Sequence, residues 1–445
     1  MVVWITARVW TPMASFTQAL KNRAYLHSSV TFLLFFASWG IWWSFFSPWL
    51  LKSPEEGGLG LSGAEQGTVY STNSIAALIV MFLYGTVQDK LGLKRHLVIL
   101  ASIAMAAIGP FFIFVYEPLL KSAFTAGVIV GAIYLSFGFL AAAGLLEAVS
   151  ERTSRRFGFE YGQARMWGSF GYAIVALVAG FLFAIDPHLN FMVGSAFGVL
   201  CLLVQIFWKD EKADAAAAHV EPSTPSLGEM VALLKMGRLW KVILVVLFTW
   251  TFYTVYDQQM FPDFYTHLFD SVKQGEQVYG VLNSVQVFLE AAMMGVVPIL
   301  MRKVGVRNIL LLGFTVMTLR ILGTAVFSDP VTVSIVKLFH ALEVPLCILG
   351  VFRYFTLHFN AKLSATLYMV GFQIASQVGV VILSPPLGAL RDQLGYQPTF
   401  YIIAATVAVA STIGYLILKR DDEEVDGDPF YRDGQEPLDT AKAGA

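Results

Sequence analysis

Charge is scarce in this chain. Charged residues make up 14% of its 445 residues and hydrophobic residues 56%, which leaves too little polar surface for a soluble protein of this size. The net charge of -1 gives no basic excess, whereas nucleic-acid binding needs one. The composition therefore predicts a membrane protein that has the lipid bilayer, and no nucleic acid, as a partner.

Two further absences narrow the class of protein. Cys201 and Cys347 are the only cysteines and both lie in apolar segments, so a disulfide framework is excluded. No Gly-Lys dipeptide occurs, which excludes a phosphate-binding loop ending in Gly-Lys-Ser or Gly-Lys-Thr, and with it an ATP-driven pump. We expect no cofactor, no metal site and no enzymatic activity.

Long apolar segments dominate what is present. A helix needs about 20 apolar residues to cross a bilayer. The first segment is too long and too aromatic for a cleavable signal peptide. We predict an all-α membrane protein with twelve transmembrane helices near 30–51, 67–89, 96–116, 123–149, 166–185, 190–208, 241–265, 277–301, 308–327, 331–355, 364–388 and 397–418.

One long polar segment separates the first six apolar segments from the last six. Lys and Arg gather on the cytoplasmic side of membrane proteins, and far more of them flank the helix ends on the side of this segment and of both termini than on the other side. We therefore expect the linker and both termini in the cytoplasm. The predicted parts are an N-terminal segment (1–29), a six-helix bundle (30–208), the linker (209–240), a second six-helix bundle (241–418) and a tail (419–445).

Eight ionisable residues lie inside these apolar segments or at their inner edges. A charge at the centre of a membrane helix costs about 2.5–3.5 kcal/mol on insertion scales, so such residues face partners or a water-filled cavity. Any one of them alone is also compatible with a structural link between helices, but the whole set favours transport, because uncharged polar residues would link helices at lower cost. The eight are Glu147, Arg165, Asp257, Glu290, Arg320, Lys337, His340 and Glu343. The last three recur at i, i+3 and i+6 and form one polar stripe.

The loop after the second apolar segment carries a recognisable pattern, GTVQDKLGLKR from Gly85 to Arg95. It resembles the G-x-x-x-D-[RK]-x-G-[RK]-[RK] loop of the major facilitator superfamily. A degenerate repeat, RKVGVR, follows the eighth segment, as expected for an internal repeat. The resemblance implies a major facilitator fold, in which two six-helix bundles alternate access to a central cavity. It also implies a conformational role for Gly85, Asp89, Gly92 and Arg95.

From about residue 25 to residue 419 the chain resembles the oligosaccharide/proton symporters of that superfamily, which include the lactose and sucrose permeases. The run FEYGQARMWGSFGY from Phe159 to Tyr172 is similar to the family's fifth-helix entry. The resemblance implies that Arg165 and Glu147 bind sugar hydroxyls through charge-assisted hydrogen bonds and that the ring of Tyr172 stacks on the sugar. Further candidate sugar-binding residues are Gln286, Glu290 and Gln373.

The same resemblance implies the proton-coupling residues. Asp257 matches the family's Asp that pairs with a tenth-helix Lys, here Lys337, while Arg320, His340 and Glu343 match the remaining positions. Glu343 lies in apolar surroundings that favour its protonated form, so we expect it to carry the proton and Arg320 to displace it.

Four positions depart from the lactose-transporting members, and one of them is Glu290, where those members carry an Asn. Where those carry a second Asp–Lys pair, this chain has Thr254 and Ser376, so both charges are missing together and neither is orphaned. Where they carry a sugar-contacting Glu, this chain has Val287. These departures favour the sucrose-transporting members of the family.

The sequence thus predicts import of a disaccharide, sucrose in first place, driven by an inward proton gradient across the inner membrane of a bacterium. We expect a monomer. A galactoside or a raffinose-type oligosaccharide (lactose, melibiose, raffinose) is the alternative substrate. A sugar-phosphorylating permease is disfavoured because segment 209–240 is too short for a phosphocarrier domain. A sensor without transport stays open on the fold alone.

Overall fold

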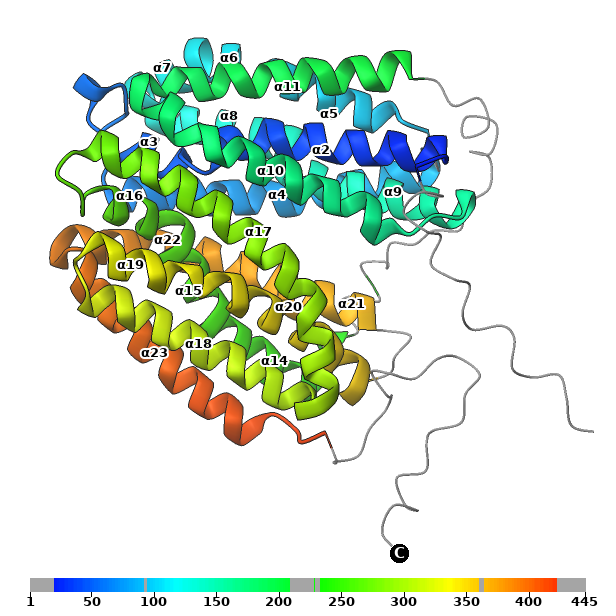
Figure 1. Ribbon diagram of the computed structural model, residues 1–445, viewed down its shortest axis with the longest axis vertical. Helices are drawn as coiled ribbons and strands as arrows, with labels where there is room; N and C mark the ends of the chain where they lie inside the picture. The colour runs from blue at the N-terminus through cyan, green and yellow to red at the C-terminus, as the bar shows by residue number, and fades with distance from the viewer. Residues whose placement is uncertain (1–19, 92–93, 209–227, 229–232, 360–363, 422–445) are drawn as a thin grey trace, which may run out of the picture. The chain divides into compact units, whose positions relative to one another are not determined.

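The computed structural model describes residues 20–91, 94–208, 228, 233–359 and 364–421. Within this part of the chain nearly all residues are helical and no strand occurs (Figure 1). Among these described residues, eleven helices are long and apolar enough to cross a membrane, or up to twelve if a bent pair is one span. The predicted all-α membrane protein is confirmed.

The helices follow one another with few long connections. The first group is α2 (Arg23–Trp43), α3 (Phe46–Leu51), α4 (Gly63–Leu91), α5 (His96–Ala106), α6 (Ile108–Phe111), α7 (Glu117–Ser122), α8 (Phe124–Leu135), α9 (Ala142–Phe157), α10 (Tyr161–Ile185) and α11 (Pro187–Phe207). The second group is α14 (Gly237–Val246), α15 (Phe252–Val255), α16 (Phe261–Thr266), α17 (Val272–Val304), α18 (Val306–Val326), α19 (Pro330–Leu338), α20 (His340–His358), α21 (Ser364–Tyr368), α22 (Ala375–Leu394) and α23 (Tyr396–Ile417).

The chain divides into two compact units. Unit 1 consists of Met1–Thr224, Gln258–Phe288 and Ser384–Gln393, and unit 2 of Pro225–Asp257, Leu289–Leu383 and Leu394–Ala445. Most of the predicted linker, 209–240, and most of the two predicted terminal segments lie outside the described residues.

Helix α2 is at the centre of unit 1 and packs against α10 and α11. Asn22 caps its N-terminus: the Asn22 side chain accepts hydrogen bonds from the backbone N–H groups of Ala24 and Tyr25. Close approach to α10 needs a glycine at Gly171, since a Cβ there would lie 2.3 Å from the carbonyl oxygen of Leu33. Small residues at such contacts are typical of membrane helices, which associate by close packing.

Several predicted continuous spans contain a local break in the structure. The expected helix 96–116 is a pair, His96–Ala106 and Ile108–Ser122, bent by 56°. Pro110 accounts for the break, because proline lacks an N–H and its ring clashes with the carbonyl of residue 106, where α5 ends. The expected helix 331–355 is interrupted at Phe339, between α19 and α20. Its backbone stays right-handed there (φ -63°, ψ -17°), so the polar stripe continues past it.

In unit 2, α18 packs against α20 and α23. Asp421, just after α23, closes the N-terminus of α18: its carboxylate accepts from the backbone N–H of Val306 at 2.6 Å and of Arg307 at 3.1 Å. Gly305 leaves room for this carboxylate, because a Cβ there would lie 2.4 Å from Asp421 Oδ2. A negative charge at a helix N-terminus is favourable.

The Asp421 cap gives a prediction for stability. Burial raises the pKa of the Asp421 carboxyl, but the nearby His358, whose Nε2 lies 3.9 Å from Oδ1, and hydrogen bonds from the backbone of Arg307 and Val306 outweigh it, so the pKa lies below its usual value. We expect Asp421→Ala to cost about 1 kcal/mol, measured as a lower unfolding temperature in detergent at pH 7. A depressed folded-state pKa means that this stabilisation persists above the unfolded-state pKa of about 3.9 and is lost as the pH falls through the folded-state value.

The pH series supplies the control for Asp421. The difference between wild type and Asp421→Ala should stay constant from pH 7 to about pH 5 and shrink only as the pH falls below about 4. Asp421→Asn keeps an acceptor oxygen, so its unfolding temperature should fall less than that of Asp421→Ala. Equal unfolding temperatures of wild type and Asp421→Ala at pH 7 would rule out the cap.

Candidate functional site

Arg165 on α10 and Glu147 on α9 form an ion pair in unit 1. Arg165 Nε lies 2.8 Å from Glu147 Oε1, and the two side chains are 30% and 40% exposed. The guanidinium lies over the ring of Phe36 on α2, 4.2 Å from its centroid. A guanidinium has five N–H donors and a carboxylate about four acceptor sites, so this half-exposed pair has hydrogen-bonding capacity beyond its one mutual bond.

Tyr172 lies two turns after Arg165 on the same face of α10, which places it roughly 10 Å further along the helix. Its half-buried ring rests on Gly40 of α2, where a Cβ would lie 2.6 Å from the ring atom Cδ2. The structure thus arranges an ion pair and an aromatic ring along one side of α10, next to α2.

The other three sugar candidates lie elsewhere. Gln286 belongs to the unit 1 part of α17 and is 3% exposed. Glu290 lies one turn later on α17, in unit 2, and is half-buried. Gln373 lies in the π-helical segment η8 (Met369–Ile374) of unit 2 and is exposed.

Unit 2 contains a buried cluster of charges centred on Arg320 of α18. Arg320 Nε donates to Glu343 Oε2 at 2.9 Å, and Nη2 lies 2.8 Å from Glu343 Oε1. Its Nη1 lies 2.9 Å from Asp257 Oδ1. The side chains of Arg320 and Glu343 are both fully buried, and one guanidinium pairs with two carboxylates from two other helical segments.

Asp257 is shared by several cations. Lys337 Nζ lies 2.7 Å from the same Oδ1 that Arg320 approaches, and His340 Nδ1 lies 3.3 Å from it. Asp257 stands in a π-helical segment, η6 (Tyr256–Met260), and such local widenings of a helix are frequent at functional sites. The pairing of Asp257 with Lys337 therefore exists in the structure, but Arg320 shares the carboxylate.

His340 connects the cluster to Glu290. Its Nδ1 lies 2.9 Å from the hydroxyl of Tyr253 and 3.7 Å from Glu343 Oε1, and its Nε2 lies 3.7 Å from Glu290 Oε2. The imidazole thus stands between two carboxylates. An imidazole in this place can relay a proton between them, because its two nitrogens exchange donor and acceptor roles.

The sequence reasoning missed two aromatic residues of this cluster. The guanidinium carbon of Arg320 lies 5.2 Å from the ring centroid of Tyr253 and 5.0 Å from that of Tyr256, within the range of cation–π attraction. The signal for Tyr253 was its position one helical turn before Asp257. Uncharged residues in an apolar segment carry no insertion cost that would draw attention to them.

The candidate conformational loop is described only in part. Gly92 and the side chain of Asp89 lie outside the described residues, and Gly85 lies within α4. Arg95, at the start of α5, donates from Nη1 to the carbonyl oxygen of Trp208 at 2.9 Å and to His27 Nε2 at 2.9 Å. Arg95 therefore links the beginning of α5 to the end of α11 and to α2.

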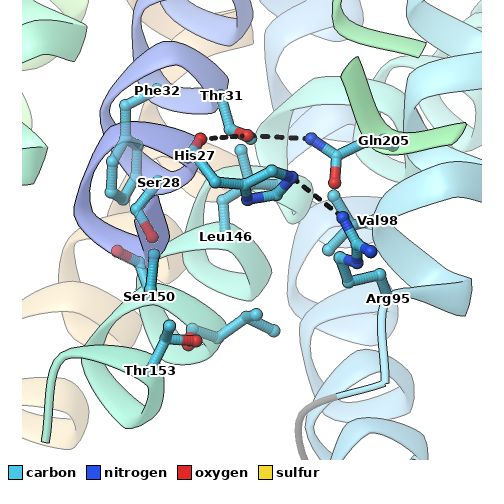
Figure 2. A pocket seen from close by; sticks show the side chains of 12 residues that line it. His27, Ser28, Thr31, Phe32, Arg95, Val98, Leu146, Ser150, Thr153 and Gln205 are labelled. Carbon is cyan, nitrogen blue, oxygen red and sulfur yellow. Dashed lines mark hydrogen bonds between the residues drawn. The ribbon is translucent and has the colours of Figure 1, made fainter. Parts of the chain in front are cut away.

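A cavity of about 60 Å³ lies beside Arg95 in unit 1. Figure 2 shows Gln205 and Arg95 on one side of it and Ser150 and Thr153 on the other, with His27 between them. Ser150 Oγ and Gln205 Oε1 have no hydrogen-bond partner among the described residues, but both atoms are themselves closed to water. None of the sugar or proton candidates is among the residues that line this cavity.

Comparisons with known proteins identify the family of the chain. The model of the LacY proton/sugar symporter family matches residues 17–426. The sucrose permease of Escherichia coli is 44% identical over 405 residues, which cover 91% of this chain and 96% of that protein. The raffinose permease of Escherichia coli is 34% identical over 402 residues, 89% of this chain and 93% of that protein. The lactose permease of Klebsiella oxytoca is 34% identical over 379 residues, which cover 84% of this chain and 90% of that protein.

Solved structures share the fold at low sequence identity. The nucleoside transporter NupG superposes with a TM-score of 0.73 at 16% identity, covering 89% of this chain and 99% of that one. A bacterial homologue of the human lysosomal transporter Spinster gives a TM-score of 0.66 at 12% identity, covering 89% and 96%. With its many apolar helices, the chain is a multi-pass inner-membrane transporter, not an enzyme, and it belongs to the LacY family of proton/sugar symporters.

Proposed function

We propose that this symporter imports a disaccharide together with a proton, and that sucrose is its substrate. The observation that carries the proposal is the 44% identity to a sucrose permease over nearly the whole chain. Thr254, Ser376 and Val287 support it, because they replace charges that mark lactose-transporting members. A raffinose-type or galactoside substrate is the alternative, favoured by the 34% identity to raffinose and lactose permeases.

Uptake separates these substrates. In cells that lack other permeases, labelled sucrose should accumulate, and an uncoupler should abolish the accumulation. A panel with raffinose, lactose and melibiose in the same cells ranks the alternatives. Accumulation of raffinose or a galactoside without sucrose would overturn the choice of sugar, and no uptake of any sugar would favour a sensor.

In this scheme, Glu147, Arg165 and Tyr172 bind the sugar. The half-exposed ion pair offers charge-assisted hydrogen bonds to hydroxyl groups, and the ring of Tyr172 offers an apolar face for the C–H side of a sugar ring. The spacing of two helical turns suits a ligand with two rings. Gln286, Glu290 and Gln373 are proposed to add hydrogen bonds.

Glu343 is proposed to carry the proton. Its carboxylate is paired with Arg320 on both oxygens, an arrangement that fits the deprotonated form. A protonated Glu343 has no charge for Arg320, and Arg320 then keeps Asp257 as its partner. Protonation of Glu343 thus breaks one ion pair, while the guanidinium keeps contact with a carboxylate that it shares with Lys337.

Several properties of the whole carrier belong to the same proposal. We assign the linker 209–240 and both termini to the cytoplasm from the distribution of Lys and Arg. The two six-helix bundles, 30–208 and 241–418, would alternate access around one sugar site. A monomer suffices for this cycle.

Arg165→Lys tests the sugar site. Lysine keeps the charge but loses the planar fork that binds two oxygens at once, and a hydrogen bond to a charged group contributes about 1.5–3 kcal/mol. We expect sucrose affinity to fall by about tenfold or more, measured as binding to the purified protein. Arg155→Lys is the matched control, because Arg155 is 78% exposed on α9 and pairs with Glu151. Unchanged affinity of Arg165→Lys would exclude Arg165 from the site.

A further inference from the structure

Ser44, just after α2, has a hydroxyl group with three hydrogen-bond partners. Ser44 Oγ lies 2.9 Å from the carbonyl oxygen of Gly40, 3.0 Å from the hydroxyl of Tyr172 and 3.1 Å from Asn283 Nδ2 of α17. Ser44 is 6% exposed and Asn283 7%. All four residues belong to unit 1, so one buried hydroxyl joins α2, α10 and α17.

The chemistry of the partners fixes the direction of each bond. A serine hydroxyl has one proton and two lone pairs. The Gly40 carbonyl can only accept, so it takes the Ser44 proton, and the Asn283 amide nitrogen can only donate, so it occupies one lone pair. The other lone pair is left for Tyr172, whose hydroxyl therefore donates to Ser44. Every hydrogen-bonding position of Ser44 is used.

This network holds the Tyr172 ring at two points. Gly40 lies against the ring near its root, since a Cβ at Gly40 would lie 2.6 Å from Cδ2 and 2.9 Å from Cγ. Ser44, one helical turn further along α2, holds the hydroxyl at the ring's far end. A ring fixed at both ends presents one face without losing rotational freedom when a ligand binds, and such preorganisation increases affinity.

We propose that Ser44 is a positioning residue for sugar binding: its hydroxyl holds the Tyr172 ring in the orientation that stacks on the sugar, and Asn283 keeps the Ser44 hydroxyl turned toward that ring. The inference rests on the proposed sugar site. It adds two residues, Ser44 and Asn283, that act through Tyr172 and do not themselves touch the sugar.

Ser44→Ala removes the hydroxyl that holds the Tyr172 ring, but the ring itself is still present in the protein. We expect the Kd for sucrose to rise about three- to tenfold, the range for one net hydrogen bond, while the rate of sugar exchange at saturating sucrose stays unchanged. Ser102→Ala is the matched control. Ser102 is also buried and donates to a carbonyl one turn earlier, that of Val98, but it lies on α5 away from Tyr172. The Kd of the Ser102→Ala variant for sucrose should equal that of wild type.

A double-mutant cycle separates positioning from general destabilisation. If Ser44 acts through the Tyr172 hydroxyl, Tyr172→Phe should raise the Kd by a similar factor, and Ser44→Ala should add nothing in the Tyr172→Phe background. Independent losses that multiply in the double variant would overturn the proposal, as would a wild-type Kd for Ser44→Ala. Should Ser44→Ala fail to fold, Asn283→Ala replaces it in the cycle, with a smaller expected loss that also vanishes in the Tyr172→Phe background.

Tyr172→Ala distinguishes this inference from the sugar site itself. If Tyr172→Ala weakens sucrose binding but Ser44→Ala does not, the sugar site stands and the role of Ser44 is wrong. If Tyr172→Ala binds sucrose like wild type, both are wrong.

Discussion

Glu343→Gln is expected to bind sugar and to exchange internal for external sugar, yet to fail to accumulate it against a gradient. An amide resembles the protonated carboxyl, so the loaded carrier can change sides. It cannot release a proton, so the unloaded return that net transport needs should stop. In this variant Arg320 and Lys337 both stay close to Asp257 Oδ1, at 2.9 and 2.7 Å, so each buried cation keeps a carboxylate in contact, although one carboxylate then serves both.

The measurement compares two assays on the same cells. Uptake driven by a proton gradient should fall to the level of equilibration, while exchange of labelled for unlabelled sucrose should continue. Glu151→Gln on α9 is the control, because Glu151 pairs with the exposed Arg155 outside the charge cluster. If Glu343→Gln still accumulates sugar in an uncoupler-sensitive way, the proton is carried elsewhere. Glu290, beyond His340, is then the next candidate.

Asp257→Asn is expected to abolish uptake, and far more completely than Lys337→Met. Asp257 Oδ1 is shared by Lys337 and Arg320, so losing the carboxylate leaves two buried cations with Glu343 as their principal counter-charge. Removing one partner of a buried ion pair costs about 3–5 kcal/mol. Losing Lys337 is milder, because Arg320 still holds Asp257.

The double variant tests this charge balance. Asp257→Asn with Lys337→Met restores one cation to one carboxylate in Arg320 and Glu343, so uptake should recover well above that of Asp257→Asn alone. Protein in the membrane must be measured in parallel, since a variant that fails to insert would mimic lost transport. If the double variant takes up no more sugar than Asp257→Asn, the Asp257–Lys337 pair has a role beyond charge neutralisation.

The transmembrane helices and the buried charges were predictable because both follow from the cost of placing groups in lipid. Apolar length predicted the spans, and the stripe Lys337, His340 and Glu343 stood out as charges in an apolar segment. The structure places all three in one cluster. The break after α5 had a visible signal in Pro110, but a proline alone does not say whether a membrane helix bends or stops.

The sequence did not show that two cations share the carboxylate of Asp257. The sequence pairs Asp257 with Lys337 through a family resemblance, but which other cation reaches the same oxygen depends on side-chain rotamers and on the π-helical turn at η6. Ser44 and Asn283 were missed for a different reason. Such residues insert into membranes at little cost, so only their hydrogen bonds to a neighbour on another helix reveal them.

The carboxylate of Asp421 also sets a limit for protein engineering. It is supplied by a residue beyond the last spanning helix, yet it closes the start of α18, the helix that carries Arg320. A purification tag or fluorescent reporter joined after Asp421 keeps this contact, whereas a junction placed at the end of α23 removes it. The choice of fusion point at the tail thus affects the helix that holds the charge cluster.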